Sequence, residues 1–284
     1  MNKPILVTTQ DPVIFDLHTY NGYGLGHEEI YVGVDTRIAN IRDFSFPKWV
    51  NVLDIDLYEY GLSIGADLLY MREHPTISSL VFQHYMKEQL GLTDCINLDD
   101  DIIIKDLPRL REFFAEPYVA FIEKNNPRRW ASPENERIKA FEDLLGRKLA
   151  PIWGMHDFGK VKKIKRAYIN SGQYAVRLTD EYVGGIQRLV SHPYFIRELA
   201  DHLHEREERY AGDDFKFQSH ADEQWYVGDH MKMQMGEIPL MKDQRNHIGM
   251  TKAHKDYDGP DSVFMVHFLG AVNKVDRMAG YVLG

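Results

Sequence analysis

The chain contains 284 residues with a formal net charge of -9 and one cysteine, Cys95. A chain of this length can bury a substantial core, and its acidic balance argues against a protein coated in nucleic acid. The single cysteine excludes an intramolecular disulfide, and no apolar run reaches the length of about 18 residues that a membrane-spanning helix needs. The apolar start is too short for a signal peptide, so we expect a cytoplasmic protein.

Short β-like segments alternate with helical ones along the chain, without an internal repeat. The expected strands are rich in Val, Ile or Tyr and cover residues 5–9, 30–34, 50–57, 95–98, 118–122, 167–169, 174–178 and 263–267. The expected helices cover residues 76–90, 132–145, 179–190, 193–210 and 221–233. Helix 132–145 has the clearest ends, since Ser132 can cap it, Pro133 fits its first turn and Gly146 can close it. The pattern predicts an α/β fold.

The most informative segment is an acidic cluster in residues 97–104, where Asp99, Asp100 and Asp101 lie between apolar residues. Adjacent anions repel one another unless a cation neutralises them, and a divalent metal is the obvious cation. The cluster follows the expected strand 95–98, and open α/β sheets bind ligands at the carboxyl ends of their strands. Strand alternation would put Asp99 and Asp101 on one side and Asp100 on the other, so the first two are the expected metal pair. The alternative is a solvated acidic turn.

A small polar segment in the second half of the chain could approach a ligand. Asn170, Ser171 and Gly172 lie between the expected strands 167–169 and 174–178. A turn at this point would let backbone and amide groups come close to a bound molecule. The alternative is a hairpin or bulge glycine with a structural role.

Two further segments carry chemically useful side chains. Asp222, Glu223 and Gln224 open the expected helix 221–233, although Asp222 could also belong to a capping box that holds the helix start. His267 directly follows an apolar strand. Its alternative is a structural histidine with its hydrogen bonds satisfied inside the fold.

In this order, the segments resemble a family of GT-A glycosyltransferases, the retaining family 8 with its glycogenin-like and lipopolysaccharide galactosyltransferase members. Residues 98–103 are similar to the Leu-Asp-x-Asp-Ile-Ile signature of that family. Residues 170–172 are similar to its Asn-x-Gly segment, and residues 267–270 to its His-Phe-x-Gly segment. The resemblance spans most of the chain. It implies a GT-A fold, in which a Rossmann-like mixed sheet is flanked by helices.

The resemblance also implies a set of ligands. Asp99, Asp101 and His267 would bind Mn2+ or Mg2+, and a UDP-sugar would be the donor substrate. Residues 30–37 look like a nucleotide-binding strand, and the Asp100 carboxylate suits ribose or sugar hydroxyls. The expected donor contacts are Asp35, Arg37, Asp100, Asn170, Ser171, Gly172, Gly270 and Lys274.

The sequence departs from the family pattern at three points. Lys274 lies seven residues after His267 instead of six. Helix 76–90 lacks the arginine that reaches the donor in the family. Glu223 is inserted between the acid and the amide of the usual Asp-Gln pair, so either Asp222 or Glu223 could face the sugar.

These residues predict transfer of a sugar to an acceptor hydroxyl. A metal would stabilise the negative charge that develops on the leaving diphosphate, and Asp222, Glu223 or Gln224 could stabilise the positive charge at the anomeric carbon. The resemblance implies retention of configuration. A metal-dependent phosphohydrolase and an inactive sugar-nucleotide-binding module are the alternatives.

The acceptor is indicated by basic residues on an otherwise acidic chain. Five of the seven residues in 160–166 are basic, and Arg128 and Arg129 precede an aromatic residue. Such clusters neutralise phosphates, although they can also form a solvated basic loop. The acceptor is therefore expected to be a glycan or small molecule, or a hydroxymethylated DNA base of the kind that phages modify, which would place the protein in the host cytoplasm. The residues expected to contact it are Arg128, Arg129, Lys162, Lys163 and Lys165.

The strands are dense before residue 104 and scattered after it. We therefore expect residues 1–104 mainly to bind the nucleotide-sugar, and residues 105–284 mainly to bind the acceptor and complete the site. Nothing in the composition marks a linker between them. Residues 1–284 are expected to form a single continuous domain.

Overall fold

The computed structural model describes residues 3–20, 29–37, 39–74, 76–122, 135–148, 169–209, 223, 226–231, 247–249, 264–268 and 273–283, and the structural statements below concern these residues. Its strands are β1 (Ile5–Thr9), β2 (Ile30–Val34), β3 (Asn51–Asp56), β4 (Asp94–Asp99), β5 (Ile102–Ile104), β6 (Val119–Ile122), β7 (Ile169–Arg177), β8 (His247–Gly249) and β9 (Met265–His267). Its helices are α1 (Pro12–Thr19), the short 3-10 helix η1 (Ile41–Asp43), α2 (Leu57–Ser63), α3 (Leu68–Glu73), α4 (Ile77–Leu90), α5 (Leu107–Phe113), α6 (Asn135–Leu145), α7 (Asp180–Val190), α8 (Pro193–Arg209) and α10 (Lys274–Leu283).

The main sheet has six strands in the order β3-β2-β1-β4-β7-β6. Neighbours among β3, β2, β1 and β4 run parallel, whereas β7 is antiparallel to both β4 and β6. The mixed α/β sheet flanked by helices that the sequence predicts is therefore confirmed. The carboxyl ends of four adjacent strands meet along one edge of this sheet.

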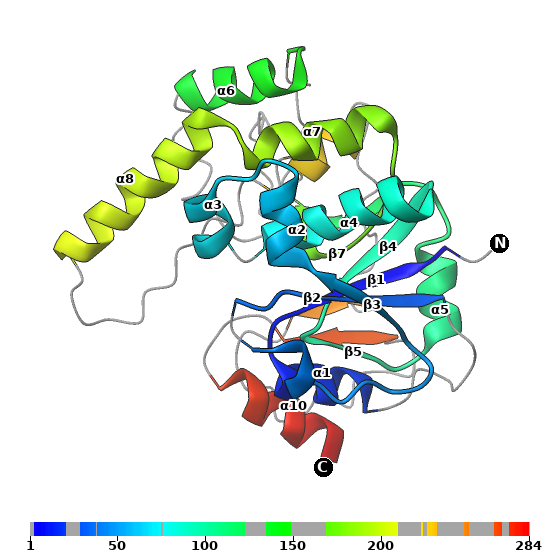
Figure 1. Cartoon of the computed structure of the whole chain (residues 1–284). Helices are drawn as coiled ribbons and strands as arrows, with labels where there is room; N and C mark the ends of the chain where they lie inside the picture. The colour runs from blue at the N-terminus through cyan, green and yellow to red at the C-terminus, as the bar shows by residue number, and fades with distance from the viewer. Residues whose placement is uncertain are drawn as a thin grey trace, which may run out of the picture.

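Side-chain alternation along the strands separates two apolar layers. In β1, Leu6 packs into the core cluster that includes α4, whereas Ile5 and Val7 pack into the cluster on the opposite face. Helices α2, α4 and α7 cover one face of the main sheet, while β5, α1 and α10 lie on the other side (Figure 1). Successive residues of a strand point to opposite faces, so an all-apolar strand such as Ile5–Val7 fits a sheet covered on both sides.

A small second sheet underlies the main one and has the order β5-β9-β8. Strand β5 follows β4 after a two-residue turn and pairs antiparallel with β9. Ile102 and Ile104 face the main sheet, whereas Ile103 packs with Phe268 and Met278 beneath the second sheet. The second sheet therefore joins the segment after the acidic cluster to the C-terminal part of the chain.

Most predicted elements are found, with ends that differ by a few residues. Helix 132–145 is found as α6, which begins at Asn135 in the described region, and Gly146 adopts the left-handed conformation that closes it, with φ of 66°. The short elements α1, α2, α3, α5, β5, β8 and α10 were not predicted. None of the described helices is long and apolar enough to cross a membrane.

The predicted turn at Asn170, Ser171 and Gly172 is wrong, because all three residues belong to the continuous strand β7. Between Ala120 and Ile122, the partner on β7 moves from Tyr174 to Ile169, so β7 carries extra residues at this point. The segment is thus an irregularity within a strand. The segment lies between two paired residues of β7, since Gln173 pairs with Leu98 of β4 and Ile169 pairs with Ile122 of β6.

The close packing of β2 predicts the effect of a small substitution. A Cβ atom at Gly33 would lie 2.9 Å from Leu57 Cδ1 and 3.1 Å from the Phe82 ring. We expect G33A to lower the free energy of unfolding by about 1–3 kcal/mol, measured by urea denaturation. G280A is the control, because none of the described residues lies within 4 Å of its Cβ position on α10 and alanine favours a helix. Wild-type stability of G33A would contradict this packing.

Candidate functional site

Polar groups gather where the parallel strands of the main sheet end. Thr9 ends β1, Asp35 follows β2 and Asp99 ends β4, and Thr8 of β1 is in register with Asp99. The chain leaves β1 toward β2 on one side, while β4 adds to the other side of β1. In open α/β sheets, a crevice forms at the carboxyl edge where the order of strands reverses in this way.

The structure brings Asp99, Asp101 and His267 together at this edge. One potential ligand atom from each lies within 4.8 Å of the others, and His267 Nε2 is 3.0 Å from Asp101 Oδ1. His267 reaches the acids because it is the last residue of β9, where it pairs with Ile102 of β5. The backbone N–H of Phe268 donates to the Asp101 carbonyl over 2.9 Å, which fixes the same junction.

The reason for the pairing of Asp99 and Asp101 differs from the predicted one. Strand alternation does not reach Asp101, because β4 ends at Asp99 and the turn of Asp100 and Asp101 leads into another sheet. The reversal of the chain in this turn, together with pairing of β5 to β9, carries Asp101 back beside Asp99 and His267. The solvated acidic turn is excluded for Asp101, which is only 5% exposed.

Gly172 lies directly against this cluster. A Cβ atom there would be 2.5 Å from Cε1 of His267 and 2.8 Å from Oδ2 of Asp99. A side chain at this position would displace the carboxylate or the imidazole. The glycine of the Asn170–Gly172 segment is therefore needed for close approach within β7, although the segment is not a turn.

Two carboxyl groups of the acidic cluster have raised pKa values. Burial, helped by the nearby charges of Asp101 and Glu223, raises the pKa of Asp99 well above its usual value. Burial also raises the pKa of Asp100 to about 7, against the effect of a 2.6 Å hydrogen bond from Thr9 Oγ1. Both shifts have the direction expected for buried carboxyl groups.

Asp101 differs because it has two partners. Burial alone would raise its pKa, but the charges and hydrogen bonds of His267 and Lys274 outweigh burial and lower it. Lys274 Nζ lies 2.5 Å from Asp101 Oδ2. The lysine expected to contact the donor thus contacts one of the expected metal ligands.

Glu223 is the member of the Asp222–Gln224 segment that the structure describes, and it is buried beside the site. Only 1% of its surface is exposed, and its Oε1 accepts a hydrogen bond from Ser79 Oγ over 2.5 Å. Ser79 lies in the first turn of α4. Asp222 and Gln224 lie outside the described residues.

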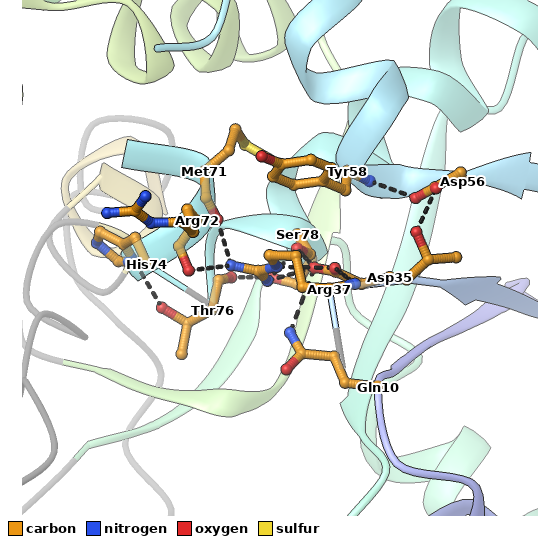
Figure 2. A network of polar contacts seen from close by, with 12 residues as sticks. Gln10, Asp35, Arg37, Asp56, Tyr58, Met71, Arg72, His74, Thr76 and Ser78 are labelled. Carbon is orange, nitrogen blue, oxygen red and sulfur yellow. Dashed lines mark hydrogen bonds and ion pairs between the residues drawn. The ribbon is translucent and has the colours of Figure 1, made fainter. Parts of the chain in front are cut away.

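Asp35 and Arg37 form a buried network beyond the end of β2, shown in Figure 2. Arg37 Nε donates to Asp35 Oδ1 over 2.7 Å, and its guanidinium also reaches the Met71 carbonyl and Ser78 Oγ. Gln10, which directly follows β1, donates a hydrogen bond from Nε2 to Asp35 Oδ2 over 3.3 Å. The two expected donor contacts are therefore held against each other and against the start of α4.

Several expected site residues fall outside the described part of the chain. They are the expected donor contact Gly270 and the five expected acceptor contacts, Arg128, Arg129, Lys162, Lys163 and Lys165. For Asn170 and Ser171, the structure gives the backbone as part of β7. The roles assigned to these residues stay predictions.

Sequence reasoning missed the hydroxyl groups that hold the site acids. Thr9 donates to Asp100, Ser78 donates to Asp35 and Ser79 donates to Glu223. Thr9 is the last residue of the apolar strand β1. Because open α/β sheets bind ligands at the carboxyl ends of their strands, the sequence could have indicated Thr9 as well as Asp99. The two serines lie at a helix start, where sequence alone favours a capping role.

No protein-family model and no curated protein matches the chain. Among solved structures, the chain is similar to mouse xyloside xylosyltransferase 1 in its apo form, with 14% identity over 96% of this chain and 99% of that chain and a TM-score of 0.47. It is also similar to the galactosyltransferase LgtC in complex with donor and acceptor sugar analogs, with 14% identity over 98% of this chain and 95% of that chain and a TM-score of 0.42.

Proposed function

We propose that the protein is a metal-dependent glycosyltransferase that moves a sugar from a nucleotide-diphosphate sugar, with UDP-sugar as the expected donor, to an acceptor hydroxyl. The observation that carries this proposal is the buried cluster of Asp99, Asp101 and His267 at the carboxyl edge of a mostly parallel sheet. The order of segments that resembles family 8 supports the same assignment. In this proposal, residues 1–284 form one GT-A-type catalytic domain.

The cluster fits a divalent metal such as Mn2+ or Mg2+. Two carboxylates and an imidazole supply oxygen and nitrogen donors, and the absence of a side chain at Gly172 lets β7 approach them closely. His267 Nε2 lies 3.0 Å from Asp101 Oδ1, so these two residues would hold such an ion together with Asp99. When bound, such a metal supplies positive charge to the departing diphosphate.

The remaining residues are proposed to orient the donor around this centre. Asp100, held by Thr9, can accept hydrogen bonds from ribose or sugar hydroxyls. The Asp35–Arg37 pair follows β2, which is separated from β4 by β1. We propose that this pair forms the nucleoside side of the site. The diphosphate is assigned to Lys274 and to the glycine segment around Gly270 by resemblance.

Glu223 is proposed to act on the sugar itself. Its carboxylate is buried close enough to Asp99 to affect the pKa of that residue, and Ser79 fixes one of its oxygens. A fixed carboxylate stabilises positive charge at an anomeric carbon, which fits transfer with retention. Asp222 and Gln224 stay candidates for the same task.

The acceptor is proposed to be a glycan, a small hydroxyl compound or a hydroxymethylated DNA base. The basic residues between 128 and 166 support an anionic acceptor. Hydrolysis of a phosphoester in place of transfer would instead favour the phosphohydrolase alternative.

The first test removes a proposed metal ligand. We expect D101A to weaken Mn2+ binding by at least about 100-fold, because loss of even an indirect partner of a metal costs about 10- to 100-fold. Calorimetry measures the binding. Transfer is measured with radiolabelled UDP-sugars, with glycans, small hydroxyl compounds and hydroxymethylcytosine DNA as acceptors. We expect D101A to lose this transfer together with Mn2+ binding. D201A, an exposed aspartate on α8, is the charge-matched control. Metal-dependent transfer by D101A at the wild-type level would contradict the assignment of Asp101 as a metal ligand.

A second test uses the close approach of Gly172 to the cluster. G172A should weaken Mn2+ binding by at least about 10-fold, because the added methyl group would press on His267 and Asp99. G184A is the matched control, since the contact nearest to its Cβ position, a guanidinium nitrogen of Arg188, lies at 3.5 Å. Equal Mn2+ affinity in G172A and the wild type would contradict a metal at this position.

A third test separates binding from catalysis at Glu223. E223Q keeps a hydrogen-bonding partner for Ser79 but removes the negative charge. We expect kcat for transfer to fall by about 100-fold or more while the KM for the donor stays near its wild-type value, as for a group that acts on the transition state. E112Q, an exposed site on α5, is the control. A rise in KM with unchanged kcat would assign Glu223 to donor binding.

A further inference from the structure

Lys274 places a positive charge beside Asp101. Its Nζ lies 2.5 Å from Asp101 Oδ2, and its side chain is 26% exposed, whereas the Asp101 side chain is 8% exposed. Asp101 Oδ1 faces His267 Nε2 at 3.0 Å. Each oxygen of this carboxylate therefore already has a neighbour in the fold.

The position of Lys274 on its helix is unfavourable without Asp101. Lys274 is the first residue of α10, where the helix dipole presents positive charge and favours anions. Contact with the Asp101 carboxylate gives a physical reason for a cation at this helix start.

A metal and this ammonium group compete for the same anion. A divalent ion held by Asp99, Asp101 and His267 would bring like charge next to Lys274 Nζ, and like charges repel strongly in a buried site. The lysine side chain is flexible and has three donors, so it can leave one anion for another. A diphosphate is an anion of that kind, and in the proposed reaction it arrives with the donor.

We propose that Lys274 takes the place of the metal as the counter-charge of Asp101 in the metal-free protein, lowers the affinity for the metal, and moves to the donor diphosphate once the metal is bound. This inference rests on the proposed function. It makes Lys274 a positioning residue with opposite effects on two ligands, against the metal and in favour of the donor. A lysine that only orients Asp101 would favour the metal.

The experiment compares K274M with K105M by calorimetry, using MnCl2 alone and then UDP at saturating Mn2+. Lys105 follows β5 and is exposed, so K105M changes the net charge equally without touching Asp101. Because a hydrogen bond between charged groups carries about a tenfold or greater effect, we expect K274M to bind Mn2+ at least about 10-fold more tightly than the wild type and UDP at least about 10-fold more weakly. K105M should stay within about twofold of the wild type for both, as expected of a screened surface charge.

Two results would overturn the inference without touching the proposed function. One is Mn2+ affinity in K274M that is equal to or weaker than in the wild type. The other is a gain of the same size in K105M, which would be a general charge effect. Absence of Mn2+ binding in the wild type would instead overturn the metal site itself, and the inference with it. K274Q, which keeps a polar side chain, repeats the comparison if K274M does not show a wild-type melting temperature.

Discussion

The arrangement of the site depends on the contacts that the Asp101 carboxylate makes with His267 and Lys274. A buried anion is costly unless charged or hydrogen-bonding partners surround it. Asp101 obtains these partners from distant parts of the chain, with His267 on β9 and Lys274 on α10, the latter 173 residues further along. The second sheet and the C-terminal helix are thereby attached to the end of β4. The same partners place an imidazole beside two carboxylates.

The first turn of α4 links the two sides of the site. Ser78 donates to Asp35, and the adjacent Ser79 donates to Glu223. Because α4 packs on β1 through the buried cluster that contains Leu6 and Leu80, these two serines are held by the core of the protein. The nucleoside side and the sugar side of the proposed site therefore depend on one helix, and a shift of α4 would move both together.

Elements that depend on local patterns could be predicted from the sequence, whereas elements that depend on pairing between distant segments could not. Strand β1 and helix α4 were predicted well, because their apolar patterns and helix-closing residues are local. The turn at Asn170–Gly172 was wrong, because glycine is read locally as a turn, whereas β7 pairs with β4 at Gln173 and with β6 at Ile169, on either side of the segment. Strand β5 has three residues and exists only through its pairing with β9.

The α/β class followed from the sequence, because apolar periodicity is a property of single segments. Asp99 and Asp101 were named as metal-ligand candidates because adjacent carboxylates need a cation, and His267 was added by the family resemblance. Three contacts become visible only in the folded chain: Gly172 touches the cluster, Glu223 is the buried acid near Asp99, and Lys274 contacts Asp101. These contacts join segments more than 70 residues apart, as Asp99 and Gly172 do. Such distances are closed by strand pairing and burial, which no local pattern encodes.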